Sequence, residues 1–296
     1  GMLGFGALFG VLLTGFTPTR LIQVVQGAAV LTVVLNLAAS WKQEPRRAAV
    51  PKSARQAAPS FSATWARFAS AGQTVRFMVA VALGTAAFNM QDIILEPYGG
   101  EVLKLSVSAT TALTALMALG ALAAFALGAR QLGRGADPMR LAAMGALVGL
   151  AAFSAVIFAE PLQSAQLFRA GAVLIGFGGG LFSVATLTHA MGLDVSVPGS
   201  NNGLNGLAVG AWGSVQATVG GVAIALGGAI RDGVSSLATH GALGDALGST
   251  ATGYSFVYHV ELYLLFATLI AIGPLVGRGQ RRNALPGKFG LAELPG

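Results

Sequence analysis

The chain has 296 residues, of which 54% are hydrophobic and only 10% are charged. A soluble domain typically carries about 25% charged residues, so too few charges remain here to cover a large soluble core. The absence of cysteine excludes disulfides and thiol chemistry. The formal charge of +7 comes without aromatic residues interleaved among the basic ones, which argues against nucleic-acid binding. The composition therefore predicts an all-α integral membrane protein.

Eight apolar stretches approach or exceed the roughly 20 residues that a membrane-spanning helix needs. The first stretch is too short to span and lacks the charged start and cleavage site of a signal peptide. We interpret it as the end of a helix whose beginning is missing. The runs are continuous and rich in Ala, Leu and Gly, without the alternation of a membrane β-barrel. The eight stretches are residues 1–14, 21–41, 76–96, 105–128, 140–159, 169–191, 203–229 and 255–277.

The loop charges predict an orientation. Residues 42–75 form the only long basic linker, with Pro45, Pro51 and Pro59. If this linker is cytoplasmic and the helices alternate, fourteen of the 18 Lys and Arg residues lie on the cytoplasmic side and four on the other. Such a bias is typical of cytoplasmic loops. The same alternation predicts a cytoplasmic C-terminus.

The linker separates two apolar stretches from six. Six helices after a long cytoplasmic loop are typical of one half of a major facilitator transporter. We therefore predict a major-facilitator-type helical bundle with about eight transmembrane segments present. Residues 1–41 would be the last two helices of an N-terminal half, 76–277 a complete C-terminal half, and 278–296 a cytoplasmic tail. The segment LGARQLGRGADPMR (127–140) loosely matches the basic, Gly-containing loop that this superfamily often has at that place.

The segment NMQDIILEPYGG (89–100) places acids at the end of an apolar helix. Asp92 and Glu96 are four residues apart and would share one helix face near the non-cytoplasmic interface, before a turn at residues 97–100. One interpretation is a helix end whose acids meet water. The other is a polar cluster that faces the bundle interior or a partner, because acids within spans usually mark sites. Gln91 is a further candidate, although it points away from that face.

The last apolar stretch contains His259 and Glu261, which are two residues apart and would face opposite ways. His259 would share a face with Tyr263. A neutral imidazole can bind a metal, including the Mg of a chlorophyll, although a hydrogen bond to a neighbouring helix is the alternative. Glu261 would lie about 10 Å inside its helix, and at that depth a lone carboxylate needs a partner or a proton.

The stretch 203–229 is rich in glycine. Gly206 and Gly210 form a GxxxG motif, and together with Gly213 they predict close helix packing. The alternative is a smooth groove for a flat macrocycle or a partner helix, with Gln216 as an inward hydrogen-bonding group. No metal-spaced His cluster or P-loop is visible in the sequence, so we expect neither an enzyme nor a protein-bound metal ion.

Several segments resemble the PucC/LhaA family, a branch of the major facilitator fold from phototrophic bacteria. They are MQDIILEPYGGEVL (90–103), RLIQVVQGAAVLTVVLNLAASWKQE (20–44), GAWGSVQATVGGVAIALGGAIRD (210–232) and GYSFVYHVELYLLFATLIAIGPLV (253–276). Members have twelve helices, of which this chain would hold about the last eight. The resemblance implies a factor for assembly of light-harvesting antennae in the bacterial inner photosynthetic membrane. It also implies bacteriochlorophyll as a ligand, and lipid and antenna polypeptides or the photosynthetic core complex as partners.

Two other functions compete with antenna assembly. One is a secondary transporter of a small or amphipathic solute, and the other is a membrane enzyme of pigment synthesis. Ion-coupled transport usually needs ionisable residues near the membrane midplane. The predicted places of Asp92, Glu96 and Glu261 all lie nearer the non-cytoplasmic face, which favours assembly.

Overall fold

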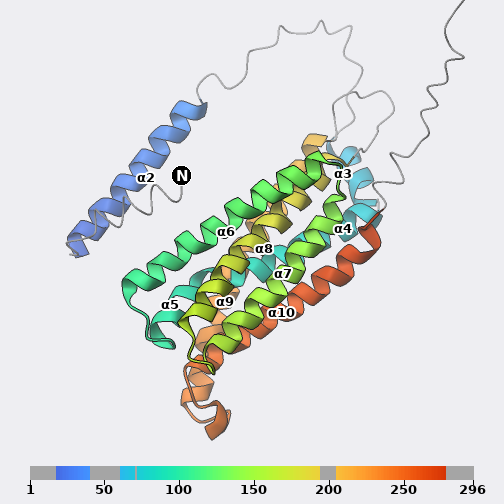
Figure 1. The fold of residues 1–296 in the computed structure, drawn as a ribbon. Helices are drawn as coiled ribbons and strands as arrows, with labels where there is room; N and C mark the ends of the chain where they lie inside the picture. Colours follow the sequence, from blue (N-terminus) through green and yellow to red (C-terminus); the bar gives the residue numbers. More distant parts are fainter. Residues whose placement is uncertain (1–17, 41–60, 71, 194–204, 278–296) are drawn as a thin grey trace, which may run out of the picture. The chain divides into compact units, whose positions relative to one another are not determined.

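A computed structural model of the chain describes residues 18–40, 61–70, 72–193 and 205–277. The chain divides into two compact units, Gly1–Ser60 and Phe61–Gly296, which we describe separately. Figure 1 shows that every regular element of the described residues is a helix. The expected helix end at residues 1–14 lies outside the described residues.

The first unit contains one described helix, α2 (Pro18–Ser40), where the sequence predicted a span at 21–41. Its apolar part, Gln26–Ala38, is exposed along most of its length. The polar side chains within it bond to the helix itself: the Thr32 hydroxyl donates to the Ala28 carbonyl and the Asn36 amide to the Thr32 carbonyl, both at 2.8 Å. The helix thus leaves few polar groups in need of water.

The second unit contains six helices, in the described part of the chain, that are long and apolar enough to cross a membrane. This makes the protein a multi-pass helical membrane protein. Its elements are α3 (Phe61–Ser70), α4 (Gly72–Asn89), η2 (Met90–Ile93), α5 (Leu95–Glu101), α6 (Val107–Gly133), α7 (Pro138–Ala159), α8 (Ala165–Met191), α9 (Asn205–Thr239), η3 (Asp245–Leu247), α10 (Ala251–Ile272) and η4 (Gly273–Leu275).

The first span of this unit is interrupted and runs further than predicted. After Asn89 the α-helix gives way to the 3-10 helix η2, and a new helix, α5, begins at Leu95. Pro97 lies in the first turn of α5, where a backbone N–H has no intrahelical partner to lose. The predicted turn at residues 97–100 is therefore wrong, and the span reaches Glu101.

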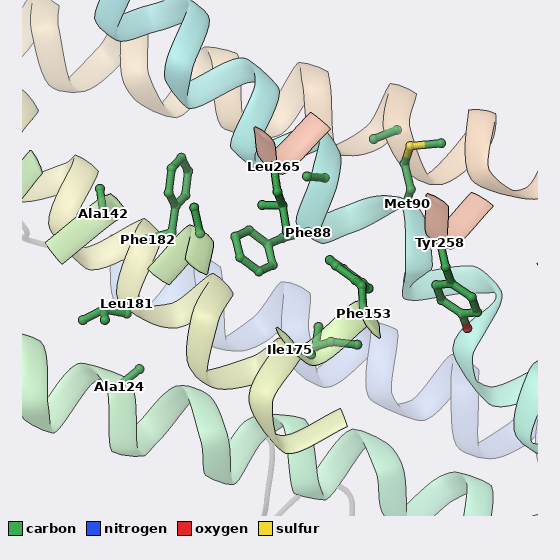
Figure 2. Close-up of a cluster of buried hydrophobic side chains, with 14 of the residues drawn as sticks. Phe88, Met90, Ala124, Ala142, Phe153, Ile175, Leu181, Phe182, Tyr258 and Leu265 are labelled. Carbon is green, nitrogen blue, oxygen red and sulfur yellow. The ribbon is translucent and has the colours of Figure 1, made fainter. Parts of the chain in front are cut away.

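Helix α8 packs between α6 and α7, and α10 packs against α4, α7 and α9. Small residues allow these helices to approach closely. A Cβ added at Gly145 of α7 would lie 2.7 Å from the Gly178 carbonyl oxygen of α8, and one at Gly176 would lie 2.0 Å from that of Met117 of α6. Figure 2 shows Phe88, Phe153 and Phe182 in the core between these helices.

Several predicted boundaries move. Helix α6 continues to Gly133, so the predicted loop 127–140 shrinks to the few residues before Pro138. Within it, Asp137 caps α7: one carboxylate oxygen accepts from the Met139 N–H (2.9 Å) and the other from the Gly277 N–H (2.5 Å). Helix α9 ends at Thr239 rather than at residue 229, and α3 lies inside the segment predicted as linker.

Candidate functional site

The 3-10 helix η2 concentrates polar groups in an otherwise apolar bundle. The Gln91 side chain is fully buried, and its amide N–H groups donate to the Phe88 carbonyl (3.3 Å) and to the Asp92 carboxylate. Its side-chain oxygen has no hydrogen-bond partner within the described part of the chain. The preceding Asn89 amide donates to the Thr85 carbonyl at 2.7 Å. The break in the helix thus coincides with a buried side-chain acceptor, the Gln91 oxygen.

A cavity of about 190 Å³ opens beside η2. One wall is polar and comes from α4, η2 and α9. The facing wall is the small-residue side of α8. The Thr85 hydroxyl donates to the Gln216 side-chain oxygen at 3.1 Å, which joins α4 to α9 across this space. The cavity therefore brings together three predicted site residues, Gln91, Asp92 and Gln216. Its other polar and glycine lining residues are Thr85, Asn89, Ser183, Gly84, Gly176, Gly179 and Gly180.

Glu96 makes a different contact from Asp92. It is exposed and accepts a hydrogen bond from the Thr114 hydroxyl of α6 at 2.6 Å. The prediction that the two acids share one face assumed a continuous α-helix. The 3-10 helix η2 lies between α4 and α5, and its different number of residues per turn changes the direction of Asp92 relative to Glu96. Asp92 lines the cavity, and Glu96 is absent from its lining.

Glu261 lies near the middle of α10, because that helix begins at Ala251 and not at the predicted residue 255. It is fully buried, and neither carboxylate oxygen has a hydrogen-bond partner among the described residues. Tyr258, three residues earlier on the same face, is also fully buried with an unpaired hydroxyl. Glu261 therefore lies further from the start of its helix than predicted.

A cluster of three tyrosines joins α5 to α10, and sequence reasoning did not find it. The ring of Tyr98 lies 5.4 Å from those of both Tyr254 and Tyr258. The Tyr254 hydroxyl donates to the Glu101 carboxylate at 2.7 Å, and the Arg231 guanidinium lies 4.8 Å from the Tyr254 ring centre. The one signal in the sequence is the four-residue spacing of Tyr254 and Tyr258, which places both on one helix face.

His259 is on the outer side of α10, opposite the buried Glu261, which confirms that the two residues face different ways. Its Nδ1 lies 2.7 Å from the Ser255 carbonyl oxygen. A carbonyl only accepts, so Nδ1 carries a proton, and Nε2 is the ring nitrogen left for another partner. Tyr263, which the sequence placed on the same face, is 71% exposed. Phe256 and Phe266 are exposed on the same helix.

The glycines predicted to pack closely do not do so within the described part of the chain. A Cβ added at Gly206, Gly210 or Gly213 would meet no heavy atom within 4 Å. The close approach of α9 occurs further along, at Gly227, where a Cβ would lie 2.3 Å from the Met90 carbonyl oxygen. Helix α9 therefore does pack closely against a neighbour, but it does so through Gly227 against η2 and not through the GxxxG motif.

The six apolar helices and their buried polar centre define a multi-pass helical membrane protein. Comparison with known families gives the particular family. The model described as "PUCC protein" matches residues 1–280, so the chain belongs to the PucC family. No solved structure matches the chain.

Three curated relatives illustrate the similarity. The chain is 45% identical, over 99% of its length, to a protein from the puhA-bchM intergenic region of Rhodobacter capsulatus, covering 62% of that relative. It is 46% identical, over 79% of its length, to Protein PucC of Rhodovulum sulfidophilum, covering 51% of it. It is 27% identical, over 92% of its length, to the bacteriochlorophyll synthase 44.5 kDa chain of Rhodobacter capsulatus, covering 61% of it. The chain thus spans between half and two thirds of these relatives.

Proposed function

We propose that this protein is an assembly factor for light-harvesting antennae that binds or delivers bacteriochlorophyll in the bacterial inner photosynthetic membrane. Membership of the PucC family supports a role in photosynthetic complex or pigment assembly. So does the similarity to the relative named as a bacteriochlorophyll synthase chain. The proposed partners are antenna polypeptides or the photosynthetic core complex, together with membrane lipid, and the proposed role is not enzymatic.

The geometry of His259 is the observation that carries this proposal. His259 would supply a ring nitrogen to the Mg of a bacteriochlorophyll, because Nδ1–H donates to the Ser255 carbonyl and Nε2 is left available. The exposed aromatic side chains along α10 offer an apolar surface for a macrocycle and its hydrocarbon tail. The internal cavity, at about 190 Å³, is smaller than the roughly 300–1,000 Å³ usual for ligand pockets. Pigment would therefore lie on the outer face of α10.

A secondary transporter is the second candidate. In that case the described helices would form the C-terminal half of a major-facilitator-type bundle, with the last two helices of the other half before them. The buried Glu261 near the middle of α10, and a polar cavity beside η2, favour this function more than the sequence alone did. Uptake of a solute by vesicles that contain the protein, without bound pigment, would support it over antenna assembly.

We predict that residues 42–75 and the C-terminus are cytoplasmic, because most of the basic residues then lie on that side. The chain has no cysteine, so single cysteines can be introduced without background labelling. A Ser53→Cys variant should react with a membrane-impermeant thiol reagent from the cytoplasmic side. An Ala242→Cys variant, in the exposed turn after α9, should react from the opposite side. Labelling of both variants from one side would contradict this orientation.

The assembly role predicts that the acids near η2 matter more for antenna yield than for folding. An Asp92→Asn variant keeps the shape of the side chain and its contact with Gln91 but removes the charge that faces the cavity. In a host that lacks the native gene, this variant should reach a normal protein level while the antenna absorption falls severalfold. Glu96→Gln, whose partner is Thr114, is the matched comparison outside the cavity. A parallel loss of the protein itself would indicate that Asp92 is structural.

A further inference from the structure

Buried acceptor atoms outnumber donors where η2 packs against α10. Both carboxylate oxygens of Glu261 and the side-chain oxygen of Gln91 are buried without a side-chain or geometric hydrogen-bond partner among the residues that the structure describes, and so is the Tyr258 hydroxyl. All three residues are fully buried. The amide N–H groups of Gln91 are directed at Phe88 and Asp92. The Tyr258 hydroxyl is the one possible donor among these unpaired side-chain groups, and the other three atoms are acceptor oxygens. The cluster therefore has fewer side-chain hydrogens than acceptor oxygens.

No cation in the described part of the chain pairs with Glu261. On α4, Arg76 donates to the carbonyl of Ala271, which lies at the C-terminal end of α10 and far from Glu261 in the sequence of that helix. On α9, Arg231 pairs with Asp232 at 2.7 Å and stacks on Tyr254, and its buried Nε has no hydrogen-bond partner among the described residues. The charged residues of α7 and its caps, Asp137, Arg140 and Glu160, lie at the two ends of that helix, and Glu101 accepts from Tyr254. Among the described residues, Asp92 on η2 is the acidic side chain that acts on Glu261, and the backbone N–H of Gln91 also lies close to the Glu261 carboxylate.

We propose that Glu261 is a proton-binding site in the interior of the membrane, loaded from the cavity through Asp92. Asp92 lines the cavity, and Glu261 lies behind η2, where α10 packs against it. In the loading step the Asp92 carboxyl gives its proton to a Glu261 carboxylate oxygen, and a hydronium ion that enters the cavity then returns a proton to the Asp92 carboxylate and leaves water. The proton supplies the donor that the buried oxygens lack. This inference stands independently of pigment binding.

A proton fits this place better than a metal ion. Hard cations of the size of Na⁺ or larger require several oxygen ligands that converge on one point. Among the described residues there is no group of three or more His, Cys, Asp and Glu side chains that could hold a metal. A proton needs one oxygen to bind and a second to share it, and the Glu261 carboxylate with its neighbouring acceptors provides both.

The test uses the full chain in lipid vesicles with infrared spectroscopy. The wild-type protein should show the C=O band of a protonated carboxylic acid near neutral pH, and Glu261→Gln should lack this band. On transfer to D₂O the band should shift as the proton exchanges. In Asp92→Asn this exchange should slow by about a hundredfold, the scale of a positioned proton-transfer group, whereas Glu96→Gln should exchange like the wild type.

A second readout does not depend on the folding of a variant. A hydrophobic carbodiimide reacts with protonated carboxyl groups in apolar surroundings, and mass spectrometry of the wild-type protein should find the adduct on Glu261. Absence of both the adduct and the infrared band would overturn the proton site. Protection of Glu261 by sodium, at constant ionic strength, would overturn it in favour of a cation site. Equal exchange in Asp92→Asn and the wild type would overturn the route through Asp92.

Discussion

Replacement of Gly227 by alanine is expected to push η2 away from α9 and to destabilise the bundle. The added Cβ would lie 2.3 Å from the Met90 carbonyl oxygen, which belongs to the backbone and cannot rotate away. Overpacking of this kind costs about 1–3 kcal/mol. That cost exceeds the roughly 1 kcal/mol that alanine gains over glycine in a helix interior. The melting temperature in detergent should therefore fall.

Gly221→Ala is the matched control for Gly227→Ala. It lies on the same helix, and its added Cβ would meet no heavy atom of the described residues within 4 Å. This variant should keep or slightly raise the melting temperature, because only the helix propensity changes. Equal melting temperatures for the two variants would show that α9 does not approach η2 as closely as the structure has it. Since Met90 adjoins Gln91 and Asp92, Gly227→Ala should also lower the antenna yield.

Replacement of His259 by leucine is expected to remove most of the pigment that co-purifies with the protein. Leucine keeps an apolar side chain on the outer face of α10 but has no lone pair for the Mg. His259 is exposed, and its bond to Ser255 is local to one helix turn, so the variant should fold and accumulate normally. Pigment content per chain, measured by absorption after extraction, is the readout.

His240→Leu provides the control for this experiment. His240 is also exposed, and its Nδ1 lies 2.7 Å from the Ser236 carbonyl oxygen four residues earlier, the same local geometry as in His259. It follows the end of α9 and lies outside the apolar spans. This variant should keep its pigment. Pigment retained in His259→Leu would rule out His259 as the ligand, and an equal loss in both variants would point to a general effect of histidine removal.

The sequence was sufficient for the helices but not for their interruption. Continuous apolar runs predicted each of the six spans of the second unit, because length and hydropathy are local properties. The change to a 3-10 helix at Met90 has no periodicity of its own in so short a segment. Pro97 and the two following glycines suggested a stop. In the structure the helix has restarted just before Pro97, which occupies a position where proline is tolerated.

The site was predictable in its residue types and not in its geometry. Acids and amides in apolar spans marked Gln91, Asp92, Gln216 and Glu261 as candidates. Their grouping depends on how α4, α9 and α10 pack, and helical spacing does not encode contacts between distant spans. The depth of Glu261 was underestimated because its helix starts four residues earlier than the apolar run suggested. The GxxxG motif likewise indicated that α9 packs closely, but the partner at Gly227 follows from tertiary structure.

The central proposal is that the protein handles bacteriochlorophyll for antenna assembly, and its most direct test is the absorption spectrum of the purified protein. The protein should be isolated in mild detergent from a phototrophic host, with the same membranes from a strain that lacks it as the background. We predict stoichiometric bacteriochlorophyll, together with antenna or core-complex polypeptides. Purified protein with neither pigment nor these polypeptides, in a preparation whose vesicles take up a soluble solute, would contradict the proposal and favour a transporter.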